Sequence, residues 1–385
     1  MKILSCDVET TTFSKGNPFD LRNKMCLVGL YDGTEYNIYD IEYSETPYGS
    51  QLEEIKSKLD EADLILFFNM KFDGNHLRKY EIYYENYKVW DCQLAHFILG
   101  NQTQPYPSLD GVAEHYGLGA KLSTIKSYWD AGLQTNEIPL DELTDYLQQD
   151  LKLTYEVYLK QKEEIETTKP HLAKLINVSM ADTLVLADME WNGLLYDFDL
   201  SKKKAEDLQE QIKGIDRILW EMYPISGLNW NSNDHLSCIL YGGLLKIPCR
   251  EATKRTLKDG TIKHGERDGF SSREMVRLVE PLRGSECAKE GFWKTGGDIL
   301  ENLKASRLAK KIISLVSERA VLDKELNTYA LGLPKLYNEK HYTDDIIHGR
   351  LNQCVTRTGR LSSSEPNLQN ISGDILECFI TRYVE

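Results

Sequence analysis

Residues 2–10, Lys-Ile-Leu-Ser-Cys-Asp-Val-Glu-Thr, form a short apolar stretch that ends in two acids. The pattern predicts a β-strand over residues 2–8. Because side chains alternate along a strand, Asp7 and Glu9 should lie on the same face. Two acids at a strand end are also common on ordinary protein surfaces, so their meaning depends on what the rest of the chain places beside them.

Two later stretches carry acids in equally specific places. Asn69-Met70-Lys71-Phe72-Asp73 follows an apolar strand predicted over residues 62–68, and the carboxyl ends of such strands are where α/β sheets bind ligands. Tyr146 and Asp150 lie four residues apart in a helix predicted to open at Pro139 and run to about residue 165, so both side chains should share one helix face. Without the other acids, Tyr146 and Asp150 would fit any half-exposed helix.

Together these stretches predict a metal site. Four converging carboxylates, from Asp7, Glu9, Asp73 and Asp150, would repel one another strongly without a cation. Oxygen ligands without His or Cys suit two divalent ions, Mg²⁺ or Mn²⁺. Two such ions can activate a water and stabilise the leaving oxygen in phosphodiester cleavage, and Tyr146 could orient that water.

The set resembles the three motifs of the DEDD superfamily of 3′→5′ exonucleases, in the version with a tyrosine in the third motif. The motifs stand here as DVE, NMKFD and YLQQD, with Trp90-Asp91-Cys92-Gln93-Leu94 between the second and third. The resemblance implies a ribonuclease H-like fold and makes the four carboxylates metal ligands and catalytic residues. It also makes Tyr146 the water-orienting catalytic residue, and it places Asn69 beside the substrate backbone.

A second signature lies at residues 358–371, TGRLSSSEPNLQNI. By composition alone, this segment is a solvated loop rich in Ser and Asn. Arg, Asn and Gln are also the donors that contact nucleic-acid backbones and minor-groove acceptors. The segment is similar to the TGRLSS–PNLQNI signature of the family A DNA polymerases, the DNA polymerase I family. Residues 227–236 resemble that family's entry to the thumb, and residues 319–336 resemble its long thumb helix.

The polymerase resemblance implies further DNA contacts. It puts Arg360 against the primer-terminal base pair and Asn367, Gln369 and Asn370 along the primer–template. It assigns Thr328 and Tyr329 to the duplex-facing part of the thumb. The implied partners are a DNA primer–template and single-stranded 3′ ends.

The chain also departs from the family pattern. Ser372 stands where the family usually has Pro, and the family's D-[YF]-S metal motif, its fingers helix and its H-D-E-type motif do not occur in residues 1–385. We therefore expect the polymerase site to lie outside this sequence, with a second chain or a downstream segment carrying the remaining palm and fingers. No 5′-nuclease domain precedes residue 1, which suggests a phage-type enzyme working in the bacterial host cytoplasm.

The expected fold is α/β, with a mixed sheet covered by helices, followed by a mainly helical region and the first palm strands. We expect the exonuclease domain at residues 1–165, a helical connector and thumb at 166–340, and an incomplete palm at 341–385. Within the thumb, hydrophobic periodicity predicts helices over residues 299–317 and 320–330. Asp259-Gly260 suggests an exposed basic hairpin near residues 250–270, in which Lys254, Arg255 and Lys258 would bind DNA. The pattern fits a mobile surface loop about equally well.

Composition limits the remaining classes. The chain has 385 residues with 46 basic and 60 acidic side chains, for a net charge of −14, which argues against a nonspecific nucleic-acid coat. The charge is uneven: residues 1–160 hold 14 basic and 26 acidic side chains, whereas residues 250–319 hold 16 and 11. Eight scattered cysteines without a CxxC pair suggest reduced thiols in the cytoplasm. No apolar run is long enough for a membrane span, so we expect no membrane contact.

Three functions from different classes remain to be compared. The first is the proofreading exonuclease and DNA-binding part of a family A replicative polymerase. The second is a free-standing ribonuclease D-like exonuclease acting on RNA, against which the 358–371 signature argues. The third is a DNA-binding clamp with an inactive nuclease fold, against which the complete set of carboxylates argues.

Overall fold

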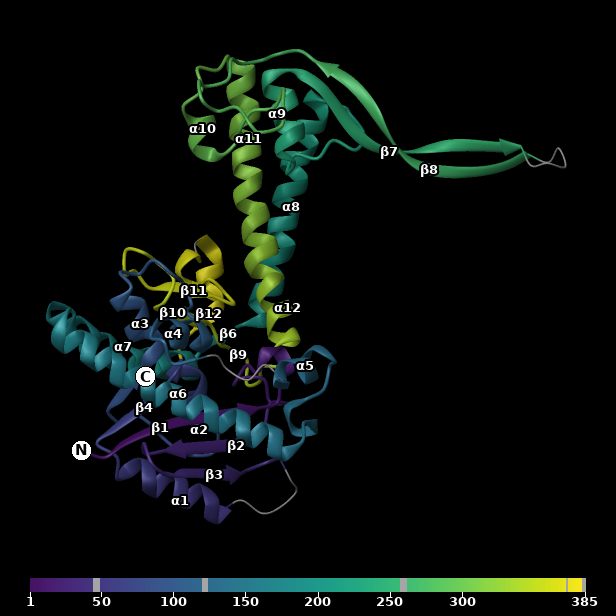
Figure 1. Cartoon of the computed structure of the whole chain (residues 1–385). Coiled ribbons are helices and arrows are strands. Elements are labelled where there is room, and N and C mark those ends of the chain that lie inside the picture. Colours follow the sequence, from purple (N-terminus) through teal and green to yellow (C-terminus); the bar gives the residue numbers. More distant parts are fainter. Residues whose placement is uncertain (44–48, 120–123, 257–261, 372, 383–385) are drawn as a thin grey trace. The chain divides into compact units, whose positions relative to one another are not determined.

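The computed structural model describes residues 1–43, 49–119, 124–256, 262–371 and 373–382 (Figure 1). The chain divides into two compact units, one made of Met1–Phe198 with Leu333–Glu385 and the other of Asp199–Gly332. Compact units reflect packing rather than function, so the functional boundaries at residues 165 and 340 stay a prediction.

A five-stranded mixed sheet organises the first unit, as the sequence predicts. Its order is β3-β2-β1-β4-β5. The central strand β1 pairs antiparallel with β2 and parallel with β4, so the acids of β1 stand in the middle of the sheet. The five strands are β1 (Ile3–Thr10), β2 (Met25–Tyr31), β3 (Tyr36–Asp40), β4 (Leu64–Phe67) and β5 (Val89–Asp91).

Helices pack on both faces of this sheet. Alternation directs Cys6 and Val8 of β1 into a buried cluster with the apolar side of α1 and α2. On the other face, Leu27 and Tyr31 of β2 pack against α6. The helices of the first unit that precede the second unit in the sequence are α1 (Gly49–Asp60), α2 (Met70–Lys79), α3 (Cys92–Leu99), α4 (Leu109–His115), α5 (Thr124–Asp130), α6 (Leu140–Thr167) and α7 (Ala173–Asn192).

The C-terminal residues return to the first unit. A second sheet has the order β12-β6-β9. In the sequence, β6 precedes the second unit, and β9 and β12 follow it. A separate two-stranded ladder pairs β10 with β11, and β11 lies inside the 358–371 signature. These elements are β6 (Leu194–Tyr196), α12 (Gly332–Glu339), β9 (Ile346–Ile347), β10 (Arg350–Asn352), β11 (Ser362–Ser364) and β12 (Phe379–Ile380).

The second unit is mainly helical, as predicted, and it carries a long hairpin. Its helices pack around a buried apolar cluster that includes Leu219, Ile239 and Ile312. The helices are α8 (Phe198–Met222), α9 (Asn233–Tyr241), α10 (Gly297–Glu301) and α11 (Arg307–Lys324), followed by a π-helical turn at Glu325–Ala330. Strands β7 (Gly243–Thr256) and β8 (Ile262–Met275) form the hairpin, which extends away from these helices (Figure 1).

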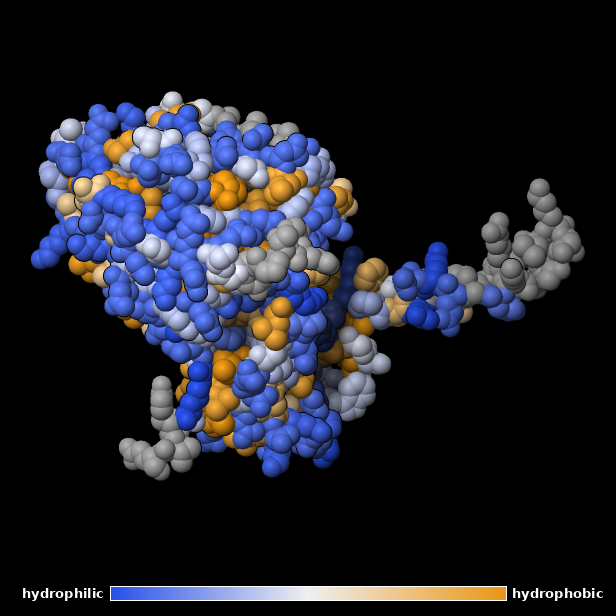
Figure 2. Space-filling view, turned by 90° about the horizontal axis from the view of Figure 1, so that it is seen from below, coloured by the Kyte–Doolittle hydropathy of each residue, from blue (hydrophilic) through white to orange (hydrophobic). Residues whose placement is uncertain are grey.

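The base of the hairpin is buried at Leu245 and Ile247, whereas most described residues of β8 are exposed. Hydrophilic residues make up most of the coloured outer part of the hairpin in the space-filling view (Figure 2). Phe270 of β8 is an apolar exception and is 63% exposed. The predicted turn at Asp259-Gly260 lies outside the described residues. Across the described part of the chain, we find no helix that combines the length and the apolar character needed to cross a bilayer.

Candidate functional site

Three of the four predicted carboxylates meet at the centre of the sheet. Asp7 and Glu9 come from β1, and Asp150 comes from α6. One ligand oxygen from each lies within 4.8 Å of the others. Glu9 and Asp150 are 7% exposed and Asp7 is half-buried. This is an oxygen-only cluster of the kind that suits Mg²⁺ or Mn²⁺.

A glycine lets α6 approach the sheet closely enough to complete the cluster. Gly29 of β2 is the direct cross-strand partner of Asp7. A Cβ built on Gly29 would lie 2.5 Å from Leu151 Cδ1 and 3.0 Å from Leu147 Cγ, both on α6. The missing side chain therefore lets this turn of α6 rest directly on β2, beside the position of Asp150.

The fourth carboxylate, Asp73, lies in the first turn of α2 and is 2% exposed. Its Oδ1 accepts a weak hydrogen bond from the backbone N–H of Val8 at 3.4 Å, which joins α2 to β1 between the two acids of that strand. Its Oδ2 is buried and has no hydrogen-bond partner. Burial, and then the negative charge of Asp7, raises the pKa of this carboxyl well above its usual value.

Tyr146 lies one helical turn before Asp150 on α6 and is half-buried. Its ring stands edge-on to Trp129, with centroids 6.0 Å apart. Burial, followed by the charges of Asp150, Glu9 and Asp7, raises the pKa of the phenol. The phenol therefore keeps its proton at neutral pH and is able to donate a hydrogen bond.

Asp91 is a buried organiser of the site whose role the sequence reasoning missed. Its carboxylate accepts from the backbone N–H groups of Asn69 and Met70, at 3.2 and 2.9 Å, and so holds the start of α2. The same carboxylate accepts from Gln93 and Leu94, at 2.9 and 3.1 Å, and so caps α3. An Asp between an apolar strand and a helix is a recognisable N-cap signal, but its second helix is visible only in three dimensions.

The predicted DNA contacts in the first unit are exposed. Asn69 stands just before α2 with a left-handed φ of 72°. Arg360 precedes β11, and the remaining three predicted contacts follow it, namely Asn367, Gln369 and Asn370. The side-chain amide of Gln369 donates to Leu361 O at 3.1 Å, which holds the two halves of the signature together.

The predicted contacts in the second unit differ among themselves. Thr328 is exposed, but Tyr329 is 2% exposed, so its ring belongs to the core rather than to a DNA-facing surface. Lys254 and Arg255 lie on β7 of the exposed hairpin. Lys258 lies outside the described residues.

Comparison with known proteins agrees with this geometry. Residues 1–166 match the model of the family described as 3'-5' exonuclease, and residues 271–382 match that of DNA polymerase family A. The chain is 28% identical to the DNA polymerase I of Synechocystis sp. over 79% of its length and 26% of the relative's. It is 27% identical to the DNA polymerase I of Rhizobium leguminosarum over 85% of its length and 28% of the relative's.

Among solved structures, the chain resembles the "POL domain of Pol1 from M. smegmatis complex with DNA primer-template and dNTP". The TM-score is 0.66 at 15% identity, over 98% of this chain and 54% of that one, so the likeness concerns the fold. The two matched segments thus correspond to a 3′-5′ exonuclease domain and to part of a polymerase domain. The chain is therefore similar to the family A DNA polymerases, and bacterial DNA polymerase I enzymes are among the proteins that it matches.

The chain spans about a quarter of the length of the curated relatives it matches. The polymerase match over residues 271–382 disfavours a free-standing ribonuclease D-like enzyme, because such a nuclease would carry no polymerase segment. The relatives named above are bacterial, so they lend no support to a phage origin.

Proposed function

We propose that this chain removes nucleotides one at a time from the 3′ ends of single-stranded DNA, as the proofreading part of a family A polymerase. The observation that carries the proposal is the convergence of Asp7, Glu9 and Asp150 within 4.8 Å beside the buried Asp73. Dense negative charge at the centre of a sheet has no evident structural use, and a phosphodiesterase needs it to bind cations.

The residues fit two divalent metal ions, Mg²⁺ or Mn²⁺, held by Asp7, Glu9, Asp73 and Asp150. Buried Asp73 Oδ2 has no hydrogen-bond partner within the protein, as expected of an oxygen kept for a ligand. Bound ions of this kind make water nucleophilic at neutral pH and stabilise the departing oxygen.

The chain's own residues supply orientation. The protonated phenol of Tyr146 stands beside the carboxylates and donates a hydrogen bond that aligns the attacking water. The carboxylate of Asp91 fixes the first turn of α2 and so keeps Asp73 in place. Exposed Asn69, at the start of that turn, binds the backbone of the strand.

The test is the double variant Asp7→Ala with Glu9→Ala, assayed on a 5′-labelled single-stranded DNA with Mg²⁺ or Mn²⁺. We expect the rate to fall by several orders of magnitude, because activation of water by the ions carries most of the barrier reduction. Binding of DNA in EDTA should be largely retained. Cleavage by the double variant at the wild-type rate would falsify the assignment, and degradation of RNA in preference to DNA would favour the ribonuclease alternative.

The rest of the chain binds the duplex upstream of the cut strand in this proposal. The support is the local excess of basic residues over 250–319, together with exposed Arg360, Asn367, Gln369 and Asn370. Replacing Lys254, Arg255 and Lys258 by Ala should flatten the dependence of affinity on salt. Affinity that does not respond to salt would contradict this part.

We further propose that polymerisation needs sequence beyond these 385 residues, on the same chain or on a second one. The phage-type origin expected from the sequence stays a prediction, which the genomic neighbourhood of the gene would test.

A further inference from the structure

A buried ion pair links three distant parts of the first unit. Lys71 of α2 donates through Nζ to Glu190 Oε1 of α7 at 2.5 Å, and these side chains are 15% and 6% exposed. The same Oε1 accepts from the backbone N–H of Leu351 in β10 at 2.6 Å. Lys71 Nζ also donates to the backbone oxygen of Leu351. Both backbone polar groups of one β10 residue are thus bound by one ion pair.

Further bonds between α7 and the segment after β10 reinforce this attachment. Thr183 Oγ1 donates to Gln353 Oε1 at 2.9 Å, and Gln353 Nε2 donates to the backbone oxygen of Ser179 at 3.2 Å. On its other side, Leu351 pairs with Ser363 of β11, inside the 358–371 signature. The ion pair therefore directly connects the helix that carries Asp73 with the strand ladder of the polymerase-family signature.

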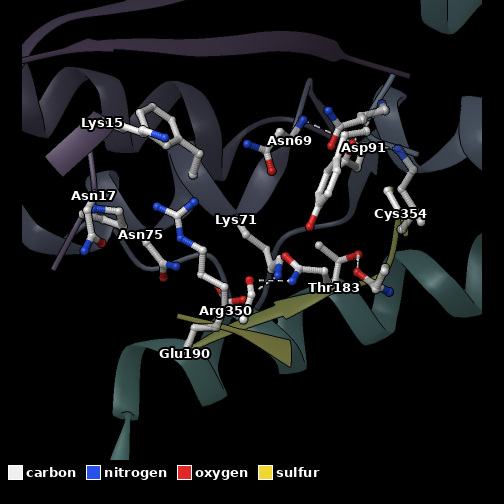
Figure 3. A pocket seen from close by; sticks show the side chains of 18 of the residues that line it. Lys15, Asn17, Asn69, Lys71, Asn75, Asp91, Thr183, Glu190, Arg350 and Cys354 are labelled. Atoms are coloured by element: carbon white, nitrogen blue, oxygen red, sulfur yellow. Dashed lines mark hydrogen bonds and ion pairs between the residues drawn. The ribbon is translucent and has the colours of Figure 1, made fainter. Parts of the chain in front are cut away.

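The pair lies in the wall of a cavity of about 360 Å³ along the first turn of α2, the turn that carries Asp73 (Figure 3). Asn69, just before α2, and Phe72 of α2 line one side, and Arg350 and Asn352 of β10 line another. Lys71 is neutralised by Glu190, and Arg350 Nε lies 3.6 Å from Glu365 Oε2, so exposed Lys15 is a cation that this cavity offers a ligand. The volume and the mixture of cations, amides and rings suit a nucleotide.

We propose that Lys71 and Glu190 are positioning residues for strand binding, and that they set the spacing of the cavity wall for the nucleotides upstream of the cleaved bond. The inference rests on the proposed exonuclease function and deepens it. The acidic cluster does not depend on the pair in this view, because Asp91 and the backbone of Val8 hold α2 on their own. Loss of the pair should therefore weaken cleavage of a strand but not of a mononucleotide ester.

The experiment compares two substrates with Mn²⁺ present: a single-stranded decanucleotide, and the p-nitrophenyl ester of thymidine 5′-monophosphate, which has no upstream nucleotide. The main variant is Lys71→Met with Glu190→Gln, which removes both charges and leaves no lone buried ion. We expect kcat/KM on the decanucleotide to fall by about 10- to 100-fold, chiefly through KM, since displacements near 1 Å can cost about 10²-fold. Hydrolysis of the ester should stay within about twofold.

Two further variants sharpen the result. Asp188→Asn breaks the ion pair with Arg78, which also joins α7 to α2 but does not involve β10, so it should leave both substrates unaffected. Thr183→Val removes a bond between α7 and the β10 segment without touching a buried charge. It should lower decanucleotide cleavage by a few-fold and spare the ester, even if the double variant folds poorly.

Each remaining outcome decides against the proposal. Equal losses on both substrates would mean that the pair supports the acidic cluster itself. Unchanged rates on both would mean that it serves stability alone. A wild-type protein that hydrolyses neither substrate would instead refute the proposed exonuclease, and this inference would fall with it.

Discussion

Tyr146 and Asp73 both have raised pKa values in the acidic cluster, and the two shifts have the same cause. Asp73 is buried and Tyr146 half-buried, both near carboxylates, so the neutral form of each group is favoured and its pKa is raised. The sequence predicts both residues through their motifs. It does not predict Asp91, because a single carboxylate that holds two helices is a property of their packing.

Tyr146→Phe should leave fold and metal binding intact and slow cleavage under single-turnover conditions by about 10²-fold, the lower end of the range for positioned proton donors and acceptors. The phenol is lost but the ring stays against Trp129, so the packing is preserved. The matched control is Tyr155→Phe, also on α6, whose ring packs against Tyr31. A rate equal to wild type would reduce Tyr146 to a packing role.

Asp73 should make the metal-free protein less stable as pH rises. Its raised pKa means that the folded protein binds a proton more tightly than the unfolded chain. The free energy of unfolding therefore falls as pH climbs from the usual carboxyl pKa through the raised one, and it stays low above that. In EDTA, Asp73→Asn should raise Tm by about 2 °C or more at pH 8 and by little at pH 4.

With Mn²⁺ at pH 8, we expect the wild type to have a higher Tm than the Asp73→Asn variant. Ion binding stabilises the wild type, and the amide of the variant lacks the charge that holds the ion. Calorimetric scans with and without the ion would measure both. A lower Tm for Asp73→Asn in EDTA at pH 8 would show that the charge is already compensated within the protein.

At the scale of elements, the packing of α6 on β2 decides whether the cluster exists. The sequence predicts this helix well, because Pro139 precedes it and the period continues to Thr167. It does not reveal why the helix comes so close, since Gly29 looks like any strand glycine until Leu147 and Leu151 are seen beside it.

Gly29→Val should separate α6 from β2, because the new side chain would overlap Leu151 and Leu147. Overpacking of this kind typically costs about 1–3 kcal/mol of the free energy of unfolding. We expect weaker Mn²⁺ binding as well, since Asp150 would move away from β1. Gly214→Val is the control, because a Cβ at Gly214 meets nothing within 4 Å. Equal Mn²⁺ affinity in wild type and Gly29→Val would show that the cluster tolerates a shifted α6.

Helix boundaries in the second unit show where periodicity is insufficient. The helices predicted over residues 299–317 and 320–330 become a short α10, a continuous α11 and a π-helical turn. Ser306 caps α11 by accepting from Ala309 N, which breaks the first predicted helix. Arg319 bonds to Asp216 of α8 at 2.6 Å, in the stretch where we expected a gap. Local capping and a distant ion pair thus outweighed the hydrophobic pattern.

At the scale of the whole molecule, the chain joins an acidic cluster to a segment that matches part of the polymerase family. The family A match covers residues 271–382, and the chain spans about a quarter of its curated relatives. The sequence identifies both parts because their motifs are local. It leaves the arrangement of β10, α7 and α2 unpredicted, because Leu351, Glu190 and Lys71 are joined only in three dimensions.

The last prediction concerns primer extension. Phosphoryl transfer by a polymerase depends on acidic metal ligands and on charge stabilisation at the transferred phosphate. Among the described residues, Asp7, Glu9 and Asp150 come together beside Asp73, and we assign them to cleavage. One site does not serve both reactions. With primer–template, Mg²⁺ and all four nucleotides, we therefore expect the 385-residue chain to shorten the primer and not to lengthen it.

Adding a polypeptide with the remaining palm and fingers should restore extension if the two parts associate. Among the described residues β12 is an edge strand of its sheet, so we expect a further strand to add there. The control uses the Asp7→Ala, Glu9→Ala variant, which should extend in the mixture without shortening the primer. Extension by the 385-residue chain alone would overturn the argument, because it would require a polymerase site within residues 1–385.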